Sequence, residues 1–436
     1  MLQVLGVGFG VAVLVGNTIG MGILRTPGEV ARHLPSVPWF LAVWVAAGVY
    51  ALFGALTLAE LGAMHPRSGG VYPLVHRSLG PTAGFVAGWT DWCITTGSTA
   101  AIAMVMAEYL APLLPATLGH AAWVASAVVV GLAGLQLLGT RIGDAVQQAT
   151  SLVKGLALLG VTGVALYLSP EMASTPPVVA ATAGIVALPA GASLVTAFTL
   201  ALQSAIYTYD GWTGPLYFGE EVQDPGRDIP RAMIGGLLIV LGIYLVMNIA
   251  FLRHLPIAEM SGDPFVAATV ARRLFHGAGD TMLRVVMIVS MLVSMNALTA
   301  LSSRIPHAMS SHGLLPPALR RVNTVGTPVP ALGVSVLMTL AFILSNTFDS
   351  ALALLAFFIA FNFALAIAGV FRLRLHEPDA PRPFRVPGYP VVPAVALLGS
   401  VAFLCATVWG DPARSAAAIG LLAVSVPLAR LAKRKA

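Results

Sequence analysis

Residues 205–221 read AIYTYDGWTGPLYFGEE and interrupt an otherwise apolar run. The stretch contains an acid, Asp210, followed by Gly211, Gly214 and Pro215. Glycine loosens the backbone and proline removes a hydrogen-bond donor, so a helix that enters this stretch is expected to break in it. An acid at the break of a buried helix is costly, and its position therefore predicts a specific role.

The composition around this break is that of a membrane protein. The 436 residues are 57% hydrophobic and 10% charged, whereas soluble domains carry about 25% charged residues. Apolar runs long enough to cross a bilayer core of roughly 30 Å recur along the whole chain. Unbroken runs such as AAWVASAVVVGLAGLQLLG (121–139) favour helices over barrel strands, which would alternate in polarity. We expect an all-α polytopic membrane protein.

Twelve membrane-spanning helices are predicted, and the charges of the loops suggest their orientation. Lys and Arg are more numerous in the loops that face inward when both termini are cytoplasmic, as the positive-inside rule requires. The basic balance thus indicates contact with the lipid bilayer rather than with nucleic acid. We expect an integral protein of the plasma (inner) membrane. The spans lie near 4–24, 36–64, 81–111, 121–139, 145–168, 190–218, 231–252, 280–305, 329–346, 350–373, 391–409 and 413–431.

The residues that would support other energy sources or enzyme chemistry are missing from the sequence. Cys93 and Cys405 both fall inside apolar runs, where a thiol usually packs. The chain contains no CxxC pair, no glycine-rich nucleotide loop and no His and acid cluster with zinc spacing. We therefore expect no cofactor and no metal, and we expect gradients or exchange to supply the energy.

A second interruption, GNTIGMGI (16–23), lies in the first predicted span, five helices before the break at Asp210. Broken helices at matching positions of two halves indicate a transporter site at mid-membrane, although glycines can also serve close helix packing. An unwound helix offers N–H groups to a carboxylate and C=O groups to an ammonium group. The pair of breaks therefore favours a site for a zwitterionic amino acid.

Several motifs resemble those of the amino acid–polyamine–organocation superfamily, close to its L-type, light-chain-like branch. They include GNTIGMGILRTP, AELGAMHPRSGGVYPLVHRSLGPTAGFVAGWTDW, YTYDGWTGPLYFGEEVQDPGRDIPRA and RPFRVPGYPVVP, and the resemblance covers nearly the whole chain. It implies a single transmembrane domain, 1–436, with the LeuT-type fold. In that fold two inverted five-helix repeats, here 4–168 and 190–373, precede two further helices, here 391–431, and helices one and six are unwound at their centres.

The resemblance also implies the substrate-binding residues. It places the substrate carboxylate at the amides of Met21 and Gly22, beyond Gly20, and the amino group near the carbonyls of Thr18 and Ile19. Members commonly carry Ser where Met21 stands, so the contact here is expected to use the backbone alone. In the sixth span, Tyr207 corresponds to an aromatic lid and is the expected gate, and the carbonyls of Tyr207 and Thr208 would face the ammonium group.

Asp210 has two interpretations from the sequence. It is either the N-cap of a second half-helix that starts at Gly211, a role that Asp prefers, or a carboxylate that faces the cavity and favours substrates with a second positive charge. The residues alone leave both open.

Lys154 is the only Lys or Arg deep inside a predicted span. An unpaired cation is costly there, so it needs partners. In sodium-independent members of the resembling superfamily, a lysine at this place takes the position of a sodium ion between the first helix and span eight. The implied partners are the Gly16 carbonyl and Ser290. Lys154 would be either a fixed structural cation or a coupling group that releases a proton during the cycle.

Together these features predict a sodium-independent transporter of neutral L-amino acids, with cationic ones as an extension, that works by alternating access as an exchanger or a proton-coupled permease. A polyamine or organocation transporter, a channel and a non-transporting sensor are the alternatives. A membrane enzyme is disfavoured because Glu60, Asp91, Glu108 and Asp210 are scattered over different spans. The loop APLLPATLGHA (111–121) has no cysteine, so no disulfide-linked heavy chain is expected.

Overall fold

The computed structural model describes residues 5–110, 120–167 and 194–410, apart from 21, 35, 139, 264, 276, 346 and 347, together with parts of 412–427. These residues form helices, and the only β-structure found among them is two isolated bridges, Leu5 with Val222 and Ser68 with Phe218. The α-helices are α1 (Val7–Thr18), α2 (Gly22–His33), α3 (Val37–Met64), α4 (Val71–Leu79), α5 (Pro81–Leu110), α6 (Ala121–Gln136), α7 (Thr140–Tyr167), α8 (Leu194–Tyr209), α9 (Pro225–His254), α10 (Ile257–Met260), α11 (Val266–Phe275), α12 (Gly277–Ser311), α13 (Val329–Leu344), α14 (Phe348–His376) and α15 (Val391–Gly410). Three short 3₁₀ helices are η5 (Gly214–Tyr217), η6 (Gly219–Glu221) and η7 (Pro317–Arg320).

Seven of the described helices are long and apolar enough to cross a membrane: α3, α5, α7, α9, α12, α14 and α15. The pair α1 and α2 makes an eighth if the two helices, bent by 47° at their junction, count as one span. Helices α6, α8 and α13 are apolar but shorter. The predicted last span, 413–431, lies mostly outside the described residues. The expectation of an all-helical integral membrane protein is confirmed.

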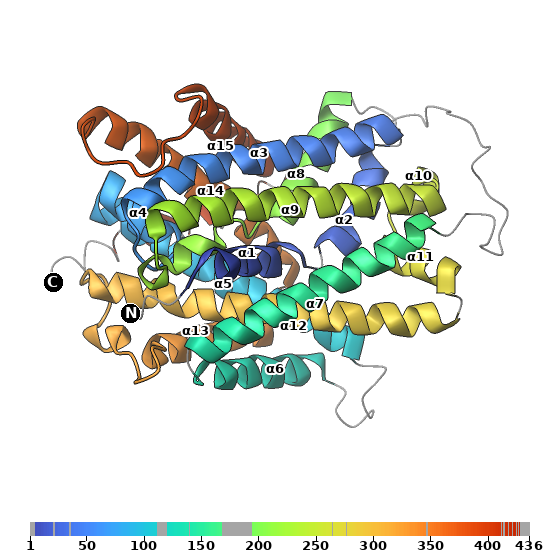
Figure 1. The fold of residues 1–436 in the computed structure, drawn as a ribbon, viewed down its shortest axis with the longest axis horizontal. Coiled ribbons are helices and arrows are strands. Elements are labelled where there is room, and N and C mark those ends of the chain that lie inside the picture. Colours follow the sequence, from blue (N-terminus) through green and yellow to red (C-terminus); the bar gives the residue numbers. More distant parts are fainter. Residues whose placement is uncertain are drawn as a thin grey trace.

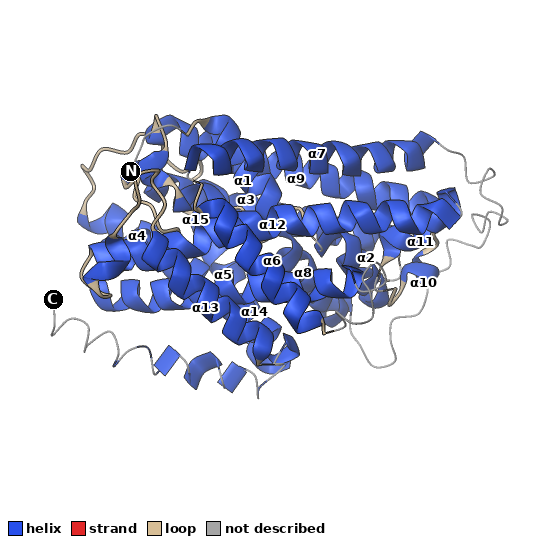
Figure 2. Cartoon of the chain, turned by 90° about the horizontal axis from the view of Figure 1, so that it is seen from below, coloured by secondary structure: helices blue, strands red, loops and turns tan. Residues whose placement is uncertain are grey.

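The long helices run roughly side by side along one direction, which is the direction expected for membrane crossing (Figures 1 and 2). The short helix α4 lies at one end of the bundle, and α10 and α11 lie at the other (Figure 1). Many exposed side chains are large and apolar, including Trp39, Leu238 and Trp409. Helices that are apolar on all sides suit a bilayer, because the outer face then contacts lipid and the inner face packs.

The sixth predicted span, 190–218, differs from the structure in its second half. Helix α8 ends at Tyr209, and the chain continues as the 3₁₀ helices η5 and η6 rather than as an α-helix. Gly211 adopts a positive φ of 115°, which an α-helix cannot contain. Pro215 then lacks the N–H that an α-helical turn would use. The first predicted span, 4–24, likewise divides into α1 and a distinct helix α2 that continues to His33.

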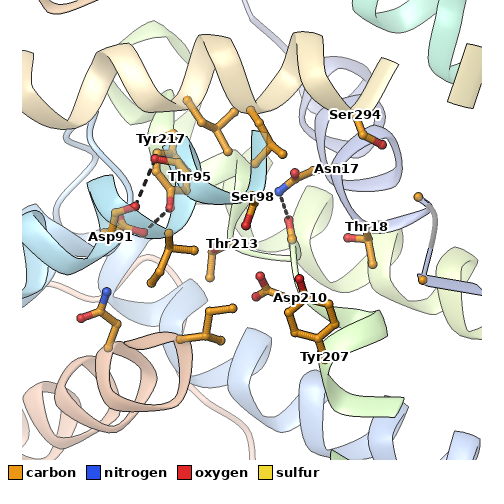
Figure 3. A pocket seen from close by; sticks show the side chains of 18 of the residues that line it. Asn17, Thr18, Asp91, Thr95, Ser98, Tyr207, Asp210, Thr213, Tyr217 and Ser294 are labelled. Carbon is orange, nitrogen blue, oxygen red and sulfur yellow. Dashed lines mark hydrogen bonds between the residues drawn. The ribbon is translucent and has the colours of Figure 1, made fainter. Parts of the chain in front are cut away.

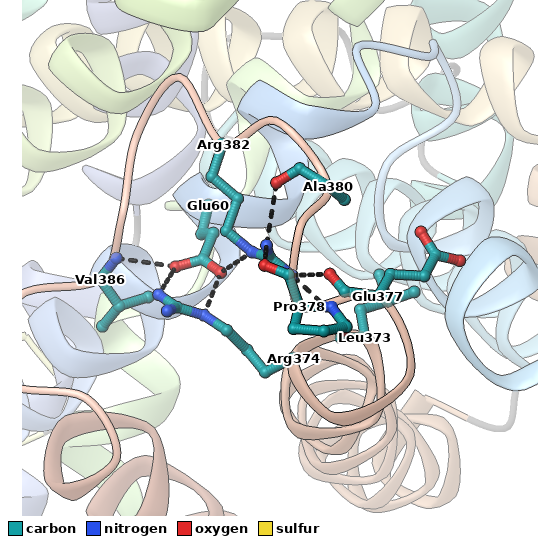
Figure 4. Close-up of polar contacts among 8 residues, drawn as sticks. All are labelled: Glu60, Leu373, Arg374, Glu377, Pro378, Ala380, Arg382 and Val386. Atoms are coloured by element: carbon teal, nitrogen blue, oxygen red, sulfur yellow. Dashed lines mark hydrogen bonds and ion pairs between the residues drawn. The ribbon is translucent and has the colours of Figure 1, made fainter.

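Two ionic clusters hold the end of the bundle at which α4 lies. Glu60 of α3 is 1% exposed and accepts two hydrogen bonds from Arg374 of α14, at 2.7 and 2.6 Å, one from Arg382 at 3.2 Å, and one from the Val386 amide at 2.8 Å (Figure 4). A buried carboxylate with this many donors is fully satisfied. Glu60 therefore ties α3 to α14 and to the segment that follows α14.

The second cluster joins the broken sixth span to α12. Arg304 of α12 donates to both carboxylate oxygens of Glu221, at 2.8 and 3.2 Å, and its guanidinium lies 4.1 Å from the centre of the Phe218 ring. Both charged partners are buried. Since breaking a buried ion pair leaves a charge uncompensated, this contact fixes the segment after the break against α12.

Candidate functional site

The two helix breaks lie directly against each other. Asn17, at the end of α1, donates through Nδ2 to the carbonyl of Gly211 at 3.4 Å. A Cβ on Gly211 would lie 2.9 Å from the backbone nitrogen of Thr18. Only glycine fits there, because the position has a positive φ and no space for a side chain. The sequence predicted the two breaks, and the structure shows that the end of α1 at Asn17 and Thr18 packs against Gly211 in the second break.

Tyr244 of α9 connects the backbones of the two broken spans. Its hydroxyl lies 2.8 Å from the carbonyl of Thr18 and 3.0 Å from the carbonyl of Thr208. A tyrosine hydroxyl has one proton, so it serves one carbonyl fully at a time and leaves acceptor capacity on both. The Thr208 hydroxyl also donates to the Thr26 hydroxyl of α2 at 2.7 Å. These contacts hold the ends of α1, α2 and α8 together.

A cavity of about 120 Å³ opens beside the breaks. A single water needs roughly 10–15 Å³ by the same measure, so this cavity has room for a small solute. Of the sequence-predicted substrate residues, Thr18, Gly20, Gly22, Tyr207, Thr208 and Asp210 line it. Figure 3 shows Thr18, Tyr207 and Asp210 among the lining side chains. Ile19 is fully buried and does not line it; its N–H ends α1 by donating to the Val15 carbonyl. Met21 lies outside the described residues.

The N-terminus of α2 borders this cavity. Helix α2 begins at Gly22, and the first N–H groups of any α-helix have no partner within the helix. Gly20 and Gly22 both line the cavity, and a Cβ on Gly22 would approach the Thr208 side chain to 2.9 Å. The small residues thus leave the backbone amides close to the cavity. Free amides and the helix dipole favour a carboxylate at such a terminus.

The carbonyls expected to face an ammonium group lie on the other broken ends. Thr18 lines the cavity, its carbonyl accepts from the Tyr244 hydroxyl, and its buried hydroxyl has no hydrogen-bond partner among the described residues. The carbonyl of Tyr207 accepts the Asp210 N–H at 3.2 Å, so part of its acceptor capacity is already used. The carbonyls of Thr18 and Thr208 share the single proton of Tyr244, so these two, like the Tyr207 carbonyl, keep acceptor capacity.

Asp210 lines the cavity next to Tyr207 (Figure 3). The predicted half-helix starting at Gly211 is not present, because the helical turn after the break begins at Gly214, and Thr213 precedes it. The N-cap interpretation of Asp210 is therefore wrong in its geometry. Tyr207 is 38% exposed and also lines the cavity, so the two side chains share one face of the broken span, as their spacing suggested.

Asp91 lines the same cavity, although the sequence interpretation treated it as one of several scattered acids. Tyr217, on η5, donates to Asp91 Oδ1 at 2.7 Å. Glu60 is satisfied by arginines and Glu108 is exposed, so these two acids are separate from the cavity. Sequence reasoning also missed several neutral polar residues of the lining; the polar run ITTGST (94–99) inside a span was the available signal for two of them, Thr95 and Ser98. The missed residues are Asn17, Thr95, Ser98, Thr213, Tyr217, Ser294 and Asn362.

Lys154 of α7 is 1% exposed and lies between the first span and α12. Its Nζ donates to the Gly16 carbonyl at 3.2 Å, the Ser290 carbonyl at 3.3 Å and the Ser294 hydroxyl at 3.0 Å. Ser294 in turn donates to the Gly16 carbonyl at 2.9 Å. Both residues that the sequence paired with Lys154 contact it, Ser290 through its backbone, whereas Ser294 was missed. A cation surrounded by neutral oxygen atoms links α7 to the broken helix.

Two discontinuous helices that meet at a polar cavity inside an apolar helix bundle are the arrangement of a secondary transporter. The sequence model described as "amino acid permease" matches residues 3–428, and the chain belongs to this family of the amino acid–polyamine–organocation superfamily. The superfamily resemblance seen in the motifs is thereby confirmed.

Individual relatives match over most of their length. The serine/threonine exchanger SteT of Bacillus subtilis (strain 168) is 28% identical over 412 residues, which cover 93% of this chain and 91% of SteT. The cystine/glutamate transporter of Homo sapiens is 28% identical over 407 residues, covering 92% and 80% of the two chains. The b(0,+)-type amino acid transporter 1 of Mus musculus is 26% identical over 422 residues, covering 93% and 82%.

Proposed function

We propose that this protein is a sodium-independent transporter of neutral L-amino acids, with cationic ones as an extension, that works by alternating access, as an exchanger or a proton-coupled permease. One observation carries the proposal. The N-terminus of α2, at Gly22, borders one small cavity together with Thr18 and Thr208, whose carbonyls accept from Tyr244. A carboxylate suits the first and an ammonium group suits the second, so the backbone alone can hold the common part of every amino acid.

The names of the relatives support exchange. The Bacillus subtilis protein is a serine/threonine exchanger and the Homo sapiens protein carries cystine and glutamate. The differing side chains of these substrates are consistent with recognition of the shared α-amino acid group by backbone atoms. The side-chain preference of this chain then depends on the remaining lining, such as Tyr207 and Asp210.

The wider architecture proposed here is the LeuT-type fold with twelve helices. Repeats 4–168 and 190–373 would be inverted relative to each other, 391–431 would follow them, and both termini would be cytoplasmic. The breaks at Thr18 and Tyr209 support it, because they fall in the first helix of each proposed repeat and meet at the cavity.

Sodium independence rests on Lys154. Its ammonium group already occupies a position between carbonyl and hydroxyl oxygens of the first span and α12. Such oxygens are the ligands that a hard cation would use, so a bound metal ion is not needed to join these elements.

A polyamine could use the acids of the cavity, but it has no carboxylate for the N-terminus of α2, so the amino acid is the better substrate.

No heavy-chain partner is required by the proposal, and the purified chain alone should transport.

The test is an uptake screen in proteoliposomes that contain only this chain. The twenty amino acids and several diamines are compared with and without substrate inside, sodium outside and a pH gradient. We expect saturable uptake of neutral amino acids that is unchanged when choline replaces sodium and that is accelerated by internal amino acid or by a pH gradient. Uptake that requires sodium would contradict the role of Lys154, and single-channel currents without saturable uptake would indicate a channel.

A further inference from the structure

Two histidines from different elements stack on each other at the end of the bundle at which α4 lies. The ring centres of His76, in α4, and His312, which directly follows α12, are 4.7 Å apart, and the ring planes are inclined by 14°. Histidine is the side chain whose charge ordinarily changes between about pH 5 and pH 8. Two stacked imidazoles can both be neutral, but two positive charges at this distance repel each other. The contact therefore depends on the protonation of the rings.

Tyr72 of α4 holds the two rings together. Its hydroxyl lies 2.8 Å from His312 Nδ1, and its ring centre lies 5.7 Å from that of His76 and 5.6 Å from that of His312. Tyr72 is fully buried, whereas His312 is exposed. A proton from the solution can thus reach His312, and Tyr72 connects His312 with the interior of the bundle.

Tyr72 also connects the histidines with the cavity. It directly follows Val71, which lines the cavity. Tyr72 belongs to a buried apolar cluster that is distinct from the main core, and two other members of this cluster, Tyr217 and Leu301, line the cavity as well. Leu314, two residues after His312, is a member too. The cluster therefore extends from the cavity wall to the stacked histidines.

The surroundings of His312 disfavour its charged form. Partial burial lowers the pKa of His312 below its ordinary value of 6.5, the positive charge of Arg67 lowers this pKa further, and Glu220 opposes both effects. Arg67 and Glu220 pair with each other at 3.3 Å, so the charge of Glu220 is already partly compensated. A proton on His312 therefore works against the contact between α4 and the end of α12.

The other elements packed around the two rings carry charges that are paired with each other. Arg77 of α4 pairs with Glu377 of α14 at 2.7 Å, and Arg304 of α12 pairs with Glu221 at 2.8 Å. Helix α5 approaches His76 through the uncharged Gly84. Further titratable side chains on these elements, which remain the same in every variant compared below, are His65, Asp91 and His307.

We propose that His76, His312 and Tyr72 form a pH-sensitive latch, which holds α4 to the end of α12 while the imidazoles are neutral and loosens when His312 takes up a proton. The proposal rests on the proposed function, because the latch would act on alternating access at the cavity. A charged His312 ring faces both His76 and Arg67, so the apolar cluster between the cavity and this end of the bundle opens more readily. The transport cycle is then faster in acid.

The experiment measures exchange of a labelled for an unlabelled neutral amino acid in proteoliposomes with the same pH on both sides. Equal pH removes any proton gradient and makes the direction of insertion irrelevant. We expect wild-type exchange to be about threefold or more faster at about pH 5.5 than at about pH 7.5. His312→Asn keeps an acceptor for the Tyr72 hydroxyl but cannot titrate, so it should match wild type at the higher pH and lose this acceleration.

Two further variants test the contact itself. His76→Asn removes the stacked ring but keeps the bond between Tyr72 and His312, and it should reduce the acceleration. The matched control is His376→Asn, because His376 is also exposed and its Nδ1 contacts a backbone oxygen, that of Arg372, at 3.0 Å. This control should keep the full response of wild type to pH.

Melting temperatures in detergent give a readout that does not depend on transport. Because the pKa of His312 is lowered in the folded protein, its contribution to stability is fully present above its ordinary pKa of 6.5 and is lost as the pH falls. The melting temperature of wild type minus that of His312→Asn should therefore decrease between about pH 7.5 and about pH 5.5.

The outcomes separate this inference from the proposed function. No exchange of any amino acid in wild type would overturn the proposed function. Exchange that is present but has the same pH profile in wild type and His312→Asn, or that becomes slower in acid, would overturn the latch and leave amino acid transport intact. Loss of the acceleration in His376→Asn as well would also overturn it, because the response would then not belong to the stacked pair.

Discussion

Lys154 is a single residue of α7 that joins the broken first span to α12. Its ammonium group contacts the Gly16 carbonyl of the broken first span and the Ser290 carbonyl and Ser294 hydroxyl of α12. Lys154 thus contacts the broken span at Gly16, while Ser151 of α7 donates to the Ala12 carbonyl earlier in α1 at 2.9 Å. A charge at this depth has little alternative to these partners, which keeps the link intact.

We predict that Lys154→Ala still binds substrate from outside but turns over slowly or asymmetrically, because the link between the broken helix and α12 is lost. The measurement is substrate binding in detergent together with uptake and efflux rates in proteoliposomes. A variant that cycles normally in both directions would remove Lys154 from the mechanism. Lys154→Arg, which keeps the charge on a bulkier group, tests whether charge alone is sufficient.

Tyr207 lies at the cavity, partly exposed, where its ring can cover a bound side chain. Tyr207→Ala should raise KM much more than it lowers protein yield, because water and substrate then exchange more easily. Uptake kinetics as a function of substrate concentration check this, with Tyr207→Phe as a control that keeps the ring. Unchanged kinetics in the alanine variant would show that Tyr207 is not a gate.

Asp210 shares that face of the broken span. In Asp210→Asn, competition by cationic amino acids should be lost while part of the neutral uptake remains, because the carboxylate but not the backbone site is removed. Competition assays with arginine and leucine measure the two effects. An equal loss of both would point to a structural role instead.

The sequence allowed the contacts of a residue to be predicted where its depth within a span determines its surroundings. Lys154 and its partners Gly16 and Ser290 follow from depth and from the resemblance. Asp91 could not be assigned, because nothing in one chain shows that α5 packs beside the two breaks. Ser294 was missed for the same reason, since a serine in a span is usually an ordinary packing residue.

At the scale of elements, the broken spans depend on Gly211. Its φ of 115° and the 2.9 Å approach of a Cβ to the Thr18 nitrogen leave no room for a side chain. Gly211→Ala adds a left-handed strain of about 1–2 kcal/mol to this clash. We predict that the variant is less stable and loses uptake, because the two breaks can no longer meet.

Gly235→Ala is the matched control, since Gly235 lies within α9 and a Cβ there would meet no atom within 4 Å. It should be neutral or more stable by about 0.5–1 kcal/mol, because alanine favours the helix. Melting temperatures in detergent and uptake rates compare the two. A Gly211→Ala protein that matches Gly235→Ala in both would contradict the packing of the breaks described above.

The sequence predicted where the helices break but not the form of the chain after the second break. Glycine and proline mark an interruption, but the choice of a 3₁₀ helix over an α-helix depends on tertiary contacts. Here those contacts are the Arg304 pair with Glu221 and the Tyr217 bond to Asp91, both far apart in sequence. Such contacts are not readable from a local pattern.

At the scale of the whole molecule, the apolar composition was sufficient to predict a helical membrane protein, because only helices and closed barrels satisfy the backbone in lipid. The count of twelve spans remains a prediction, since part of the chain lies outside the described residues. The structure adds that many elements meet at one cavity, namely α1, α2, α4, α5, α8, η5, α12 and α14. We propose that an amino acid binds there through its α-carboxylate and α-ammonium groups.

The most direct test is a structure of the protein with a transported amino acid bound, chosen from the uptake screen. We predict that its carboxylate lies at the amides that begin α2 near Gly22, and that its ammonium group lies within hydrogen-bond distance of the carbonyls of Thr18 and Thr208. An amino acid bound elsewhere, or in this cavity with its carboxylate turned away from α2, would contradict the account.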